Sequence, residues 1–144
     1  MTECFKLLRW VMLLLLLPAT LSQNSCLADS IPNGYRQIAS QYQIPADVLY
    51  AVALTKSGQT IDKGLFRPWP WTLNVAGNPQ RFTSLNAACR ELNRQLTQGI
   101  RSIDIGLMQI NWRWNHTRLR SPCRALFPYT NLHHGAALLK AAYS

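Results

Sequence analysis

The chain has 144 residues, of which 48% are hydrophobic, and its 15 Lys and Arg against 6 Asp and Glu give a formal net charge of +9. This length fits one domain with a core of its own, and the composition excludes a disordered tail. The positive charge favours an anionic partner, which is nucleic acid, an acidic membrane face or an acidic polymer.

The first segment has the pattern of a secretory signal peptide. Lys6 and Arg9 precede a short apolar run over residues 10–17, and small residues follow it. The run is shorter than the roughly 20 residues that span a bilayer. We therefore expect an exported protein, periplasmic or secreted, whose signal peptide covers residues 1–22, with cleavage as late as residue 28 as the alternative. An uncleaved membrane anchor is the competing interpretation.

Export also decides how the four cysteines are interpreted. Cys4 leaves with the signal peptide, and outside the cytoplasm the remaining thiols tend to pair. Cys89 and Cys123 are the favoured pair because both lie inside the domain expected over residues 29–144, with Cys26 left over. The alternative is that Cys89 is a small buried residue. No histidine has ligand spacing with a cysteine, so we expect no metal, and we expect no cofactor. We also expect no stable membrane span once the signal peptide is removed.

Apolar residues at helical spacing predict four helices. In chain order they cover residues 33–43, 45–57, 85–98 and 132–143. Ser84 and Asn131 are expected to cap the last two, and Gly58 to end the second. Residues 67–82 carry the prolines and turn residues of a small hairpin. The fold class expected from this pattern is mainly all-α, with one small β-hairpin.

Lys56 is the unusual position of the second helix. It follows Leu49 by seven residues and Val52 by four, which places it on the apolar face in the last turn. A charged residue is rare on such a face. One interpretation is that the side chain extends from the rim and complements the helix C-terminus. The other is that it belongs to a functional site.

Residues 103–111 hold a second unusual feature. One polar amide, Gln109, stands in an apolar stretch, and Gly106 allows a close approach of the backbone. Taken alone, the segment also fits a buried strand or a short helix whose glutamine has its hydrogen bonds made within the fold.

Four segments together resemble a known family. They are Ala53-Leu-Thr-Lys-Ser-Gly58, Pro68-Trp-Pro-Trp-Thr-Leu-Asn-Val-Ala-Gly77, Asp104-Ile-Gly-Leu-Met-Gln-Ile-Asn111 and Pro128-Tyr-Thr-Asn-Leu-His-His-Gly-Ala136. In this order they resemble the lysozyme-like lytic transglycosylases, in particular the small exported members associated with conjugative elements. The resemblance covers about residues 33–140. It implies a lysozyme-like helical domain that acts on the glycan strands of peptidoglycan.

The resemblance also implies a mechanism. The family's glutamate protonates the glycosidic oxygen and then, as a carboxylate, helps the C6 hydroxyl of muramic acid attack the anomeric carbon, which leaves a 1,6-anhydro end. Lys56 stands at the position of that glutamate and is the candidate catalytic residue. The residues that correspond to the family's sugar-binding segments are Ser57, Gly106, Leu107, Met108, Gln109 and Asn111.

Lysine does not replace glutamate chemically. An ammonium has three donors and no acceptor, and it is a weak acid at neutral pH. Asp62 and Asp104 lie nearest to the two motifs in sequence, and Asp104 is expected to be structural. The expected function is therefore that of a lytic transglycosylase with impaired activity, which opens the cell wall for a conjugation or secretion apparatus.

Two other functions remain open. The first is a catalytically inactive protein that binds peptidoglycan and helps to place such an apparatus. The second is a basic antimicrobial or nucleic-acid-binding protein that uses Trp69, Trp71, Trp112 and Trp114. These rings stack on sugars as well as on bases, and nucleic acid is not the expected partner. Binding that depends on charge alone should weaken steeply with salt.

Overall fold

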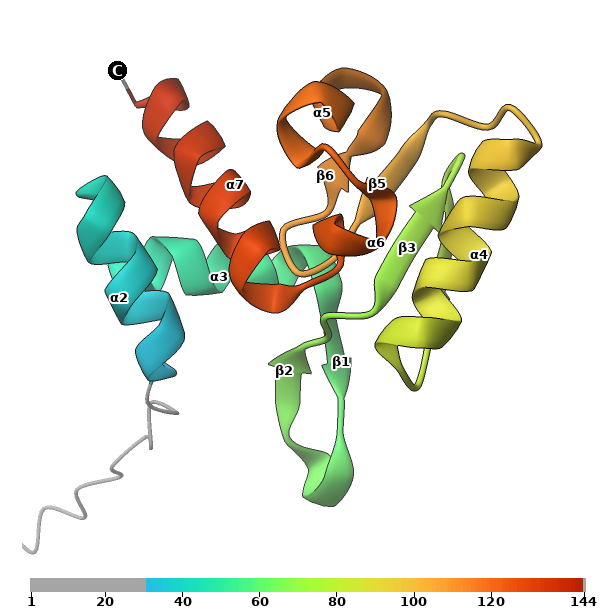
Figure 1. Ribbon diagram of the computed structural model, residues 1–144. Helices are drawn as coiled ribbons and strands as arrows, with labels where there is room; N and C mark the ends of the chain where they lie inside the picture. Colours follow the sequence, from blue (N-terminus) through green and yellow to red (C-terminus); the bar gives the residue numbers. More distant parts are fainter. Residues whose placement is uncertain (1–30, 144) are drawn as a thin grey trace, which may run out of the picture. The chain divides into compact units, whose positions relative to one another are not determined.

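The computed structural model describes residues 31–143 (Figure 1). The predicted signal peptide, with either cleavage site, lies outside these residues. The helices are α2 (Asn33–Tyr42), α3 (Ala46–Ser57), α4 (Leu85–Thr97), α5 (Trp112–Leu119), α6 (Pro122–Ala125) and α7 (Pro128–Ala142), with a 3-10 turn at Asp62–Gly64. The strands are β1 (Gly58–Thr60), β2 (Phe66–Pro68), β3 (Thr72–Val75), β4 (Asn78–Arg81), β5 (Ile103–Ile105) and β6 (Ile110–Asn111). None of the described helices is long and apolar enough to cross a membrane.

Two antiparallel sheets lie among the helices, so the expected all-α, lysozyme-like helical domain with one hairpin is wrong. β1 pairs with β2, and the second sheet has the strand order β4-β3-β5-β6. The predicted hairpin is β3 with β4, and β5 pairs with its other edge, where Leu73 lies opposite Ile105. A two-stranded hairpin is marginally stable in water. Pairing with β5 extends it and buries Ile103 and Ile105 on one face.

The sequence locates α2, α3 and α4 to within a few residues. The hydroxyl oxygen of Ser84 accepts a hydrogen bond from the backbone N–H of Ala87 at 3.2 Å, as an N-cap does. Gly58 directly follows α3, but with φ −59° it does not adopt the left-handed conformation of a typical glycine cap. A Cβ at this position would overlap the carbonyl oxygen of Leu54 and the ring of Phe66.

The core joins helices from both ends of the chain to the four-stranded sheet. α2 packs against α3 and α7, and α4 packs against β3 and α6 (Figure 1). The largest fully buried apolar side chains are those of Ile38, Leu49, Leu73, Leu92, Ile103, Ile105, Leu119 and Leu126. Because these side chains form a single cluster, the sheet and the helices support one another.

A disulfide between Cys89 and Cys123 joins α4 to α6, with the two Cα atoms 4.9 Å apart. This is the pair that the sequence favours. α6 has only four residues, too few to be stable as an isolated helix. The bridge therefore attaches the segment that leads into α7 to the longer helix α4.

We expect the Cys89→Ala/Cys123→Ala double variant to lose about 3–4 kcal/mol of unfolding free energy, because the bridge closes a loop of 34 residues in the unfolded chain. Urea denaturation measures the loss. A reducing agent should destabilise the unmodified protein by a similar amount and leave the double variant unchanged. Alkylation of both thiols in the native protein would contradict the pairing.

Candidate functional site

Lys56 and Gln109 line one groove, which has a volume of about 240 Å³. The lining residues come from α3, from the turn between β5 and β6, from β6 and from the middle of α7. The described residues that line the groove are Val52, Lys56, Met108, Gln109, Ile110, Asn111, Gly135, Leu138 and Leu139. Residues from three of the four segments that carry the family resemblance therefore line the groove.

The turn between β5 and β6 needs a glycine at its first position. Gly106 has φ +75°, which L side chains rarely adopt, and a Cβ there would lie 2.5 Å from Nδ2 of Asn131. Gln109 also has positive φ, at 47°, and its N–H donates to the carbonyl oxygen of Gly106. The turn is therefore tight and lies directly against α7.

Asn131 holds the turn in place. Its side chain is fully buried, its Oδ1 accepts from the N–H of Met108 at 2.8 Å, and its Nδ2 donates to the carbonyl oxygens of Ile105 and Ala125 at 2.8 and 3.0 Å. The expected role of Asn131 as a helix cap is wrong, because α7 already begins at Pro128. The amide instead pairs with three backbone groups, two at the turn between β5 and β6 and one at the end of α6.

Ser57 attaches the end of α3 to the same turn. Its hydroxyl is fully buried and lies 2.8 Å from the carbonyl oxygen of Leu107 and 3.0 Å from that of Ala53, as a shared donor. Ser57, Gly106 and Leu107 were expected to contact the substrate, but none of them is among the groove-lining residues. They position the groove, whereas Met108, Gln109 and Asn111 line it.

Gln109 uses the NH₂ end of its amide within the fold. Its Nε2 donates to the carbonyl oxygens of Gly106 and Thr72, at 2.9 and 3.2 Å. Only the NH₂ end can face two acceptors, so Oε1 points the other way. Oε1 accepts no hydrogen bond from any residue between 31 and 143, and it remains available to a ligand hydroxyl.

Lys56 is exposed, although its spacing places it on the apolar face. Leu49 and Ala53 are fully buried, whereas Val52 is half-buried, so Lys56 lies at the edge of the buried face of α3. The interpretation that the lysine extends from the rim therefore fits its exposure, and the lysine also lines the groove. Among the described lining residues, Lys56 is the one that carries a charge.

The described carboxylates lie elsewhere. They are those of Asp47, Asp62, Glu91 and Asp104. Asp104 accepts hydrogen bonds from Asn111 at 2.8 Å and Asn74 at 3.4 Å, across the strands β6 and β3 that flank it. Hydrogen bonds from Arg94 and Gln95 lower the pKa of Glu91. None of the described carboxylates lines the groove, and no three described His, Cys, Asp or Glu side chains are grouped to hold a metal ion.

Three of the four tryptophans singled out in the sequence are partly or fully packed. Trp112 is buried, and the rings of Trp69 and Trp71 meet edge to face with centroids 5.4 Å apart. Trp114 is 77% exposed, with the guanidinium of Arg113 5.7 Å from its ring centroid. Of these four rings, Trp114 is therefore the one that is exposed enough to stack on a ligand.

Replacing Asn131 by alanine should destabilise the fold by about 3–5 kcal/mol, because it leaves three buried backbone groups without partners. The matched control is Asn86→Ala on the exposed side of α4, expected to change stability by less than about 0.5 kcal/mol. Chemical denaturation of both variants gives the comparison. Equal, small effects would show that the buried amide does not hold the turn.

Comparison of the chain with protein-family models, with curated proteins and with solved structures gave no match.

Proposed function

We propose that this chain binds the glycan strands of peptidoglycan in the groove and that, with lysine at position 56, it cleaves them slowly or not at all. One observation carries the proposal. The helix end and the turn that resemble the sugar-binding segments of lytic transglycosylases lie far apart in sequence, yet they line one groove.

The groove has a mixed lining, which suits a sugar better than it suits a purely polar or a purely apolar ligand. Val52, Met108 and Leu138 provide apolar surface for the face of a pyranose ring. Oε1 of Gln109 can accept from a sugar hydroxyl, and the ammonium of Lys56 can donate to a hydroxyl or to the carboxylate of a muramic acid substituent. The net charge of +9 favours association with this anionic polymer.

The same lining lacks the groups for transglycosylation. The reaction needs one group that gives a proton to the glycosidic oxygen and then takes one from the C6 hydroxyl. The charged ammonium of Lys56 can do only the first, and poorly. Since no described carboxylate lines the groove, Asp62 and Asp104 do not replace the missing glutamate.

A nucleic-acid or antimicrobial function has less support. Sequence-independent binding of single strands uses aromatic rings along a basic groove. Here Trp114 alone among the candidate rings is exposed. A location outside the cytoplasm and a place beside a conjugation or secretion apparatus follow from the resemblance and the signal-like segment, and they belong to the same proposal.

The unmodified chain should co-sediment with purified peptidoglycan and release few or no anhydro ends. Leu138→Glu places a negative charge in the groove and should weaken binding by about tenfold, because like charge and lost apolar contact both oppose an anionic strand. Ala141→Glu adds the same charge to an exposed site on α7 and is the control. An equal loss of binding in the two variants, or binding that 0.5 M salt abolishes, would show that the interaction depends on charge alone.

Lys56→Glu should restore cleavage. The substituted carboxyl would lie at the C-terminal end of a helix, where the helix dipole raises a carboxyl pKa. General acid–base participation is worth roughly 10²–10⁴ in rate. Mass spectrometry of the muropeptides counts anhydro ends, and Lys56→Gln, which removes the charge without adding an acid, is the control. Cleavage by the unmodified chain, or no gain in Lys56→Glu, would refute the assignment of residue 56.

A further inference from the structure

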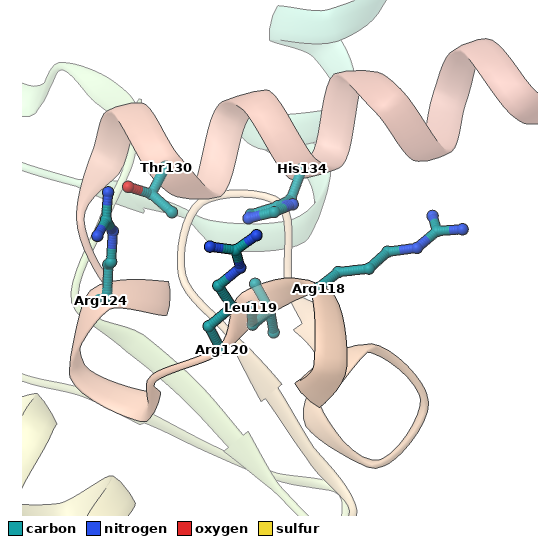
Figure 2. Close-up of a pocket in the computed structure, with 6 residues that line it drawn as sticks. All are labelled: Arg118, Leu119, Arg120, Arg124, Thr130 and His134. Carbon is teal, nitrogen blue, oxygen red and sulfur yellow. The ribbon is translucent and has the colours of Figure 1, made fainter.

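A second cavity lies where the end of α5, the short α6 and the first half of α7 meet (Figure 2). Its volume is about 260 Å³. The residues that line it are Arg118, Leu119, Arg120, Arg124, Thr130 and His134. In Figure 2 the imidazole of His134 points down from α7 toward Arg120, and the guanidinium of Arg124 extends toward Thr130.

The cavity gathers positive charge that nothing described neutralises. None of its three arginines forms an ion pair within residues 31–143. Burial, and then the positive charges of His133, Arg118 and Arg120, lower the pKa of His134. Cations held together without counter-charges repel one another, and a bound anion removes that repulsion.

The backbone at Arg120 is held in an unfavourable conformation at the edge of this cavity. Its φ and ψ are 62° and −47°, and the N–H of Ser121 donates to the carbonyl oxygen of Leu119 at 2.7 Å. This is a γ-turn of the strained hand, which a non-glycine residue rarely adopts. Such strain is concentrated at binding and active sites. Here the turn places Arg120 on the rim of the cavity, with its guanidinium beside His134 and its side chain still exposed.

We propose that this cavity is a binding site for a phosphate group. The guanidinium groups of Arg120 and Arg124 would donate to its oxygens, and the imidazole of His134 and the hydroxyl of Thr130 would complete the set. Thr130 also lies in the first turn of α7, where the helix dipole favours an anion. The inference does not depend on the groove or on glycan binding.

A phosphate fits these donors better than a carboxylate does. A phosphate monoester carries about −1.5 to −2 charge at neutral pH and offers three terminal oxygens in three directions. A carboxylate has one charge and two oxygens in one plane. The donors of the cavity come from three elements. One guanidinium group lies on α6, a second lies at the end of α5, and a third donor group lies on α7. This arrangement matches the tetrahedral anion.

Isothermal titration calorimetry with inorganic phosphate, at a constant ionic strength of about 0.15 M, tests the site. We expect binding that Arg120→Gln and His134→Gln each weaken by about tenfold or more, since each removes a charge-assisted or direct donor. Arg101→Gln is the matched control, because Arg101 lines a different cationic cavity with Trp112, Arg113 and His116. In the unmodified chain, phosphate should raise the pKa of His134, as followed by NMR.

A second arm distinguishes free phosphate from a lipid headgroup. Vesicles of phosphatidylcholine with and without phosphatidic acid are sedimented with the chain. Binding of inorganic phosphate that is lost in Arg120→Gln supports a soluble ligand. Binding only to the phosphatidic acid vesicles, again lost in Arg120→Gln, supports a headgroup.

Two outcomes overturn the proposal. The first is no binding in either arm. The second is an equal loss in Arg101→Gln, which would assign the binding to diffuse charge. Arg120→Gly controls for a loss of binding that is caused by misfolding, because glycine tolerates the backbone conformation at this position. It should keep the thermal midpoint of the unmodified chain or raise it, while phosphate binding falls as in Arg120→Gln.

Discussion

The buried amide of Asn131 is the contact on which the arrangement of the groove depends. It hydrogen-bonds to Met108 and Ile105 on the turn and to Ala125 at the end of α6, so one side chain of α7 fixes two other elements. Without it, the turn between β5 and β6 would lose its anchor to α7, and three backbone groups would be buried unpaired. The missing Cβ of Gly106 leaves room for this amide.

The distribution of charge follows from how few carboxylates the chain has. Asp104 is occupied by amides on the two strands beside it, and Glu91 is bound to Arg94 and Gln95 on its own helix. Carboxylates engaged in this way neutralise little of the cationic surface. Arginines therefore collect in cavities without acidic partners, and Lys56 stands alone in the groove. This imbalance favours anionic ligands at both places.

α7 serves both sites with different faces. Gly135, Leu138 and Leu139 line the groove, whereas Thr130 and His134 line the cationic cavity. Gly135 is required on the groove side, because a Cβ there would lie 2.4 Å from Cγ of Met108 and displace that side chain. A helix fixed by Asn131 thus sets the distance between the two sites. The groove and the cavity can therefore be tested separately by substitutions on one rigid element.

Local patterns in the sequence were enough to locate α2, α3 and α4, the β3–β4 hairpin and the Cys89–Cys123 pair, because helical spacing, caps and turn residues act over a few neighbours. Local patterns failed for α5 and α6, which are short and exist through packing with distant segments, and they left residues 103–111 open between a buried strand and a short helix, where the structure has β5, a turn and β6. They also could not show that Ser57 and Asn131 support the groove from behind rather than line or cap it. Those roles depend on hydrogen bonds to residues 50 and 26 positions away, and only the folded chain brings such partners together.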